Sequence, residues 1–227
     1  YKRQLITGGT GFIGYHLAKK CLDLNWSVDS ISKKPPPEKR KLKKVNYLKI
    51  DISEKKKISK NLKNNYDFVV NLAGYVDHSN KKKTINSHFN GCKNLADYFL
   101  TKKLKKFIQI GSSLEYGKSR SPQLESKKNI KKTYSVYSKS KLLSTKYLLS
   151  LNKKYNFPAA ILRLYLVYGP LQDQNRVIPI TIINAIQNKK FDCSDGMQFR
   201  DFTYIDDVVE AIIKTLKNKE TSGQIIN

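Results

Sequence analysis

Short apolar runs alternate along the chain with longer segments in which apolar residues recur at helical spacing. The short runs, many of them rich in β-branched residues, predict strands at 3–7, 27–32, 45–50, 67–74, 106–111 and 159–167. The longer segments predict helices at 12–24, 54–64, 84–103 and 134–152. Strands that alternate with helices form parallel β–α–β units, so the expected fold class is α/β, with a Rossmann-like doubly wound parallel sheet.

One polar segment, KKPPPEKRKLKK at 33–44, is broken by three consecutive prolines. Because it lies inside the β–α–β series, we interpret it as a crossover loop and not as a linker between domains. A long loop is expected at 112–132. A chain of 227 residues has room for one substantial core and a small second lobe.

The first predicted strand leads into a glycine-rich loop, LITGGTGFIGYHL at 5–17. Its glycines fit two registers, Gly9-x-Gly11-x-x-Gly14 and Gly8-x-x-Gly11-x-x-Gly14. The loop opens a helix, whose first N–H groups and positive dipole end attract a pyrophosphate. A glycine loop between a strand and a helix predicts a dinucleotide site.

The end of the second predicted strand bears on the choice between NAD and NADP. An acidic residue there binds the 2′-hydroxyl of NAD, whereas a basic one accommodates the 2′-phosphate of NADP. The strand ends in Ser32, Lys33 and Lys34, and Asp29 comes three residues too early to reach the ribose. The pattern favours NADP and leaves NAD open.

Candidate catalytic residues follow in the second half of the chain. In the segment YSKSK, Tyr137 and Lys141 lie four residues apart on one face of a predicted helix. An ammonium near a phenol stabilises the phenolate, which can exchange a proton with a carbinol. Ser112, at the end of a predicted strand, is placed to hydrogen-bond the same substrate oxygen. The Tyr-x-x-x-Lys spacing is weak alone, and its place after a glycine loop makes it specific.

Seven segments of the chain carry a resemblance to a known family: TGGTGFIG, KIDI, NLAG, GSSLEYG, YSKSK, LRLYLVYGP and DGMQFRDFTYIDDV. Together they resemble the extended short-chain dehydrogenase/reductase family, the NAD(P)-dependent epimerases and dehydratases of nucleotide sugars. The resemblance runs nearly end to end. It favours the register Gly8, Gly11 and Gly14, with Gly9 as a variable position.

The resemblance implies a hydride-transfer enzyme that acts on a nucleotide-diphosphate sugar, with a Ser-Tyr-Lys triad as its catalytic residues. In this chain those residues are Ser112, Tyr137 and Lys141. The implied substrate-binding residues are Ser113, Leu166 and Arg200, the last on the diphosphate. The implied contacts of NAD or NADP are Gly8, Gly11, Phe12, Ile13, Gly14, Ser32, Lys33, Asp51, Ile52, Leu72, Ala73, Gly74, Tyr137 and Lys141.

The sequence departs from the family pattern at several of these places. Dehydratases carry Asp and Glu where this chain has Ser113 and Leu114, and Glu115 is expected to face the other way. This disfavours dehydration and decarboxylation and favours epimerisation. Leu166 replaces an asparagine that contacts substrate, and His88 replaces another asparagine. We expect His88 to be a polar residue of the core or one that supports the site from behind, and not a catalytic acid. Two alternatives stay open: an NADPH-dependent reductase of a 4-keto-6-deoxy nucleotide sugar, and a non-catalytic NAD(P)-sensing regulatory protein.

The resemblance also predicts how the chain is organised. We expect a dinucleotide-binding Rossmann domain over 1–165, with contributions from about 198–217, and a partial substrate-binding region over 166–227. Relatives continue beyond the strand that GQIIN resembles, so a C-terminal truncation is expected. The helices near 84–103 and 134–152 are a possible homodimer surface.

Composition narrows the partners further. The formal net charge is +26, but only six of the 44 basic residues are arginine, and the lysines are spread over the chain. Readers of nucleic acid favour the arginine fork, so no nucleic-acid partner is expected. Cys21, Cys92 and Cys193 are widely spaced, which predicts no metal site and a reduced, cytoplasmic location. No apolar run is long enough to span a membrane, so no membrane partner is expected.

Overall fold

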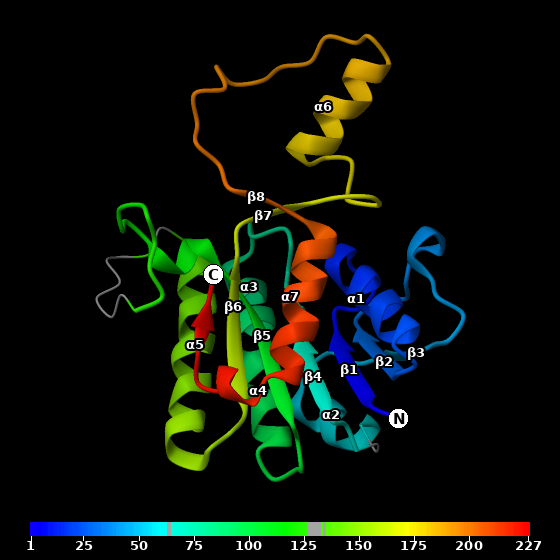
Figure 1. Ribbon diagram of the computed structural model, residues 1–227, viewed down its shortest axis with the longest axis vertical. Helices are drawn as coiled ribbons and strands as arrows, with labels where there is room; N and C mark the ends of the chain where they lie inside the picture. Colours follow the sequence, from blue (N-terminus) through cyan, green and yellow to red (C-terminus); the bar gives the residue numbers. More distant parts are fainter. Residues whose placement is uncertain (63–64, 127–132, 134) are drawn as a thin grey trace.

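Within the residues that the computed structural model describes, 1–62, 65–126, 133 and 135–227, seven parallel strands form the central sheet. Their order is β3-β2-β1-β4-β5-β6-β9 (Figure 1). The bounds are β1 (Arg3–Thr7), β2 (Ser27–Ser32), β3 (Val45–Lys49), β4 (Phe68–Asn71), β5 (Lys106–Ser112), β6 (Ala159–Leu164) and β9 (Ile225–Ile226). The order reverses between β1 and β4, and the predicted doubly wound sheet is confirmed.

Helices cover both faces of the sheet. α1 (Phe12–Asp23) and α7 (Ile205–Lys217) pack on one face. α2 (Lys55–Asn61), α4 (Gly91–Phe99) and α5 (Val136–Tyr155) pack on the other. Strands enclosed in this way read as continuous apolar runs, which is why the sequence reveals them. α7 turns its apolar positions inward from Ile205 to Leu216, so the RDFTYIDDV segment leads into a core helix.

Two predicted strands end earlier than the apolar runs that indicated them. β4 stops at Asn71, which is the residue paired with the end of β1 at Thr7. β6 stops at Leu164, which is paired with the end of β5 at Ser112. A parallel strand continues only where a neighbour offers hydrogen bonds, so the prediction of one strand over 159–167 is wrong. Instead β7 (Leu166–Tyr168) pairs with β8 (Phe202–Tyr204) in a separate sheet.

The predicted helix at 84–103 is also divided. α3 (Lys81–Ile85) passes into a π-helical turn (Asn86–Asn90) before α4 begins. Short 3₁₀ helices lie at Glu38–Arg40, Ser113–Tyr116 and Lys219–Thr221, in segments expected to be loops or a strand end. The predicted helix start at 134 and the loop residues 127–132 lie outside the described residues.

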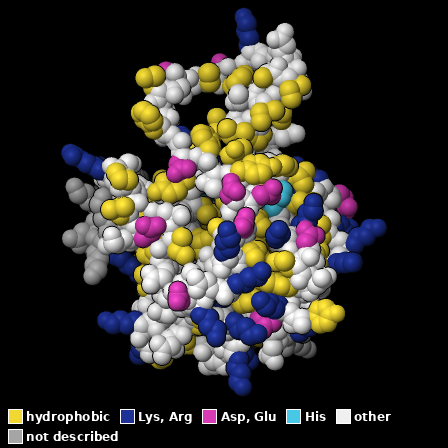
Figure 2. Space-filling view, in the orientation of Figure 1, with side chains coloured by type: hydrophobic (Ala, Val, Ile, Leu, Met, Phe, Trp, Pro, Cys, Tyr) yellow, Lys and Arg dark blue, Asp and Glu magenta, His cyan; other side chains and the backbone are white. Residues whose placement is uncertain are grey.

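A small lobe stands above the carboxyl edge of the sheet (Figure 1). It contains α6 (Val177–Ile186), in which no residue is buried although most are apolar. Figure 2 shows hydrophobic side chains gathered on this lobe, whereas lysines and arginines are scattered over the body below it. None of the described helices combines the length and the apolarity needed to cross a bilayer.

The packing of α7 predicts the effect of truncating its core face. Ile212 is fully buried, so Ile212→Ala is expected to lower the free energy of unfolding by about 2–5 kcal/mol in urea denaturation. Glu210→Ala, on the exposed face of the same helix, removes an ion pair with Lys214 and is expected to leave the free energy of unfolding nearly unchanged. Equal effects of the two changes would contradict this placement of α7.

Candidate active site

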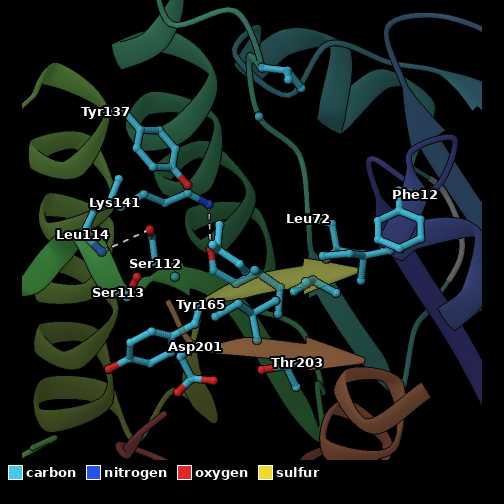
Figure 3. A pocket seen from close by; sticks show the side chains of 18 of the residues that line it. Phe12, Leu72, Ser112, Ser113, Leu114, Tyr137, Lys141, Tyr165, Asp201 and Thr203 are labelled. Carbon is cyan, nitrogen blue, oxygen red and sulfur yellow. Dashed lines mark hydrogen bonds between the residues drawn. The ribbon is translucent and has the colours of Figure 1, made fainter. Parts of the chain in front are cut away.

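A cleft of about 1620 Å³ opens at the carboxyl ends of β1, β4, β5 and β6, beneath the lobe. The lobe forms one wall, and the glycine loop and the ends of the strands form the other. Figure 3 shows Tyr137, Lys141 and Ser112 on one side of the cleft, with Phe12 and Leu72 across from them. In a doubly wound sheet, ligands bind at this edge, at the point where the strand order reverses.

The glycine loop is packed so tightly that a side chain on any of three of its glycines would collide with neighbouring atoms. Gly8 has a left-handed backbone, with φ at 70°, and a Cβ there would lie 3.0 Å from Ala73 N. A Cβ on Gly14 would lie 2.5 Å from Gly8 O. Gly9 is constrained as well, because a Cβ would lie 2.3 Å from Ser30 Oγ. The sequence favours Gly9 as a variable position of the motif, but in this chain a side chain there would have to displace Ser30.

Gly11 has a different setting at the start of α1. The nearest atom to a Cβ there would be Gly8 O at 3.2 Å, and otherwise the position faces open space in the cleft. Gly11 is the N-cap of α1 and supplies no side-chain cap, so the first N–H groups, at Phe12 and Ile13, are available to a ligand. These features fit a dinucleotide pyrophosphate, whose oxygens accept hydrogen bonds from such groups.

The other predicted cofactor residues divide into two groups. Leu72 and Gly74, after β4, line the cleft. Ala73 does not, and its N–H donates to Thr7 Oγ1 at 3.2 Å. Ile52 is buried in the core and sits where a Cβ on Gly91 would meet it, so it forms no wall of the cleft.

The strand ends near the expected ribose carry charges that neutralise each other. Lys33 Nζ lies 2.8 Å from Asp51 Oδ2, and Ser32 Oγ accepts a hydrogen bond from Thr10 at 3.1 Å. Burial raises the pKa of Asp51, but hydrogen bonds from Lys33 and Ser53 outweigh it and hold the pKa below its usual value. None of these residues lines the cleft itself. Asp29 points elsewhere, into a hydrogen bond with Tyr66.

A buried carboxylate holds the backbone of Ser112. Glu115 is fully buried, and its Oε1 accepts the N–H of Ser112 at 2.9 Å. Its Oε2 accepts from Thr145 at 2.7 Å and pairs with Arg163 at 3.1 Å. As expected, Glu115 faces away from the cleft, while Ser113 and Leu114 line it. No carboxylate from this turn therefore reaches the cleft.

Tyr137 and Lys141 lie one helical turn apart at the start of α5. Lys141 Nζ donates to Ile110 O at 2.6 Å and lies 5.9 Å from the centre of the Tyr137 ring. In Figure 3 the hydroxyl of Tyr137 is directed toward the ammonium end of Lys141. The carbonyl at the end of β5 thus fixes the lysine, so its charge stays beside the phenol.

Two histidines pack against the Tyr137 ring. His78, which the sequence did not indicate, stacks on it with ring centres 4.2 Å apart, and His88 meets it edge-on at 4.8 Å. Burial and the charge of Lys141 lower the pKa of His88 to about 3, so this ring is neutral. A Cβ on Gly74 would lie 2.2 Å from His88 Cε1, which explains the glycine. His88 is buried at the edge of the cleft and packs on Tyr137, so it is placed as a polar residue that supports the site.

The substrate-binding candidates Ser113, Leu166 and Arg200 all line the cleft. Sequence reasoning missed several other lining residues, among them Tyr75, His78, Arg40, Tyr165, Asp173, Arg176 and Asp201. The sequence did contain one signal that points to the arginines among these residues. Arginine is scarce in this lysine-rich chain, and Arg40, Arg176 and Arg200 all line the cleft. The guanidinium fork suits phosphate and carboxylate groups in a way that an ammonium does not.

Comparisons with known proteins agree with this geometry. The sequence model of the NAD dependent epimerase/dehydratase family matches residues 4–227. The chain is 30% identical to Protein CapI of Staphylococcus aureus, over 96% of this chain and 72% of that protein. It is 31% identical to a UDP-N-acetyl-alpha-D-glucosaminuronate decarboxylase of Bacillus cytotoxicus, over all of this chain and 74% of that protein.

Solved structures are similar to this one along nearly its whole length. The UDP-glucuronic acid 4-epimerase of Bacillus cereus, in complex with UDP-glucuronic acid and NAD, is 26% identical with a TM-score of 0.84. The match covers 99% of this chain and 76% of that one. The chain thus spans about three-quarters of the length of these similar proteins.

The Glu115–Arg163 pair generates a stability prediction. Glu115→Gln leaves Arg163 as an uncompensated buried charge, so the free energy of unfolding is expected to fall by about 3–5 kcal/mol. Combining Glu115→Leu with Arg163→Met removes both charges and is expected to recover part of that loss. Urea denaturation of Glu115→Leu, Arg163→Met and the double variant closes the cycle and measures the coupling. Additive losses would show that the two side chains do not depend on each other.

Proposed function

The chain belongs to the NAD dependent epimerase/dehydratase family, and from this premise we propose that it is a nucleotide-sugar 4-epimerase. The observation that carries the proposal is the pairing of Tyr137 and Lys141 at a cleft that also holds an uncapped helix start and Ser112. A relative of known structure is a 4-epimerase in complex with a UDP-sugar and NAD, and we propose the same substrate class for this cleft.

The turn after β5 supports epimerisation over elimination or decarboxylation. Some relatives are dehydratases and decarboxylases, and those reactions need an acid and a base beside the sugar. Here Ser113 and Leu114 face the cleft, and Glu115 is engaged with Arg163 in the core. Oxidation and reduction at one carbinol carbon, with no elimination, need only the phenol and its neighbours.

In the proposed mechanism, Tyr137 as phenolate accepts the proton of the sugar hydroxyl. Lys141 stabilises that phenolate, since its ammonium is fixed by the Ile110 carbonyl beside the ring. Ser112 donates a hydrogen bond to the sugar oxygen as it becomes a carbonyl. A bound nicotinamide supplies the acceptor and donor of the hydride. Once the carbonyl carbon is reduced from its opposite face, Tyr137 would return the proton to the oxygen, and the overall reaction would involve no net oxidation.

The choice of dinucleotide rests on the end of β2. We propose that Ser32, Lys33 and Lys34 accommodate the 2′-phosphate of NADP, with NAD as the weaker ligand. This feature favours the second candidate function, an NADPH-dependent reductase of a 4-keto-6-deoxy nucleotide sugar. A reductase consumes one NADPH for each sugar, whereas an epimerase leaves the dinucleotide unchanged, so a product assay separates the two. The sensor alternative predicts binding without turnover.

Tyr137→Phe is expected to lower turnover by a factor of at least about 100, because the proton acceptor is lost. Binding of NADH, followed by its fluorescence, is expected to stay within twofold of the unaltered protein. Turnover is measured with a panel of UDP-, GDP-, CDP- and dTDP-sugars. Tyr155→Phe, at the exposed end of the same helix, is the control. Near-full activity of Tyr137→Phe would overturn the assignment.

Lys33→Met is expected to weaken NADPH binding about tenfold and to leave NADH binding nearly unchanged, since Lys33, which is paired with Asp51, would turn to the 2′-phosphate only when NADPH binds. Titration of each reduced dinucleotide by fluorescence gives both dissociation constants. Lys49→Met, an exposed lysine at the end of β3, controls for the loss of one positive charge. If the affinities for NADPH and NADH fall equally, or if neither changes, the proposed NADP preference is contradicted.

A further inference from the structure

A short segment after β7, residues 170–173, crosses above the start of α1, and we call it the strap. Figure 1 shows the chain passing from β7 over α1 before it reaches α6. Two side chains of the Rossmann part hold the strap. His16 Nε2, on α1, lies 2.9 Å from Pro170 O. Arg40, in the loop after β2, makes the other contacts.

Arg40 is bound to the strap at several points. Its Nε and one terminal nitrogen donate to Leu171 O at 3.2 and 2.5 Å, and the same nitrogen lies 2.6 Å from Asp173 Oδ1. The guanidinium is nearly buried although the loop around it is exposed. Leu171 has a left-handed backbone, with φ at 64°, a conformation that persists only where its surroundings hold it.

The strap and Arg40 belong to the wall of the same cleft as the glycine loop. Arg40, Gln172 and Asp173 line it together with Gly11 and Phe12. A dinucleotide whose pyrophosphate lies at the start of α1 would therefore sit beneath the strap, between α1 and the lobe. The link joins two parts of the chain that are 133 residues apart, and both of its side chains line the cleft.

We infer that Arg40 and Asp173 form a clasp that retains the dinucleotide between turnovers. The purpose of the clasp rests on the proposed epimerase function, because an epimerase returns the hydride that it takes and has no need to exchange its cofactor. A reductase must release its oxidised dinucleotide after each turnover, and a pinned strap would slow that step. The clasp is a positioning device: it acts through the strap and does not touch the reacting atoms.

The clasp is tested by the rate at which the reduced dinucleotide, NADPH or NADH, leaves the protein. Stopped-flow fluorescence follows it after mixing the complex with excess NADP⁺ or NAD⁺. Arg40→Met is expected to raise the dissociation rate constant about tenfold, because the charged hydrogen bonds to the strap are lost. Asp173→Asn, at a half-exposed position, is expected to raise it about threefold or more. Lys41→Met, which removes an exposed charge from the same loop, is expected to change it less than twofold.

The Asp173→Asn variant separates a clasp from a direct phosphate ligand. If Arg40 binds the dinucleotide itself, removing the competing carboxylate would tighten NADH binding and slow its release, which would overturn the inference. Unchanged release in both variants would overturn it as well. Because the assay contains no sugar, its result is independent of the reaction. If the two variants release the dinucleotide faster but the unaltered protein converts no sugar, the clasp is supported and the epimerase function is refuted. If the unaltered protein epimerises a sugar but the variants release the dinucleotide at the normal rate, only the clasp is refuted.

Discussion

The direction of the strands is the constraint on which the cleft depends. All strands of the central sheet run parallel, so their carboxyl ends meet at one edge, and the functional candidates follow those ends. A chain of buried polar side chains aligns that edge: Thr7 at the end of β1 contacts Asn71 of β4, whose amide donates to Gln109 of β5 at 2.7 Å. Buried polar groups linked in this way fix the relative height of neighbouring strands. The glycine loop and Ser112 are thereby held at a common level, on which a dinucleotide and a sugar can lie side by side.

The fold was largely predictable because enclosed parallel strands leave continuous apolar runs and amphipathic helices leave a periodic stripe. The sequence could not reveal where a strand ends because the neighbouring strand with which it pairs also ends. β6 ends at Leu164 because its partner β5 ends at Ser112, and no local pattern around Leu164 records that. The π-helical turn at 86–90 also depends on contacts with another segment and could not be predicted from local sequence. It interrupts a run of good helical periodicity beside Gly74, where His88 leaves no room for a side chain.

The candidate site likewise contains residues that the sequence could predict and residues that it could not. Residues that act through local spacing, such as Tyr137 and Lys141 four apart on a helix, were predicted from the sequence and lie at the cleft. Residues whose roles depend on contacts between distant segments were not. Arg40 meets the strap only because two loops cross above α1, and His78 meets Tyr137 only because the segment after β4 folds over α5. Ile52 is a different case, because its side chain is buried in the core and its predicted contact with the dinucleotide stays a prediction. Contacts of this kind need the fold before they can be recognised.

The lysines that say little about function have a consequence at one edge of the sheet. In the described part of the chain, the sheet ends on one side in β9, which has two residues, and on the other in β3. An open strand edge is a template on which a second molecule can add a strand, and long apolar edges promote aggregation. Lys43 and Lys44 precede β3, Lys49 ends it, and all three are exposed. Their like charges repel the same edge of another copy, so these lysines disfavour pairing of β3 between molecules.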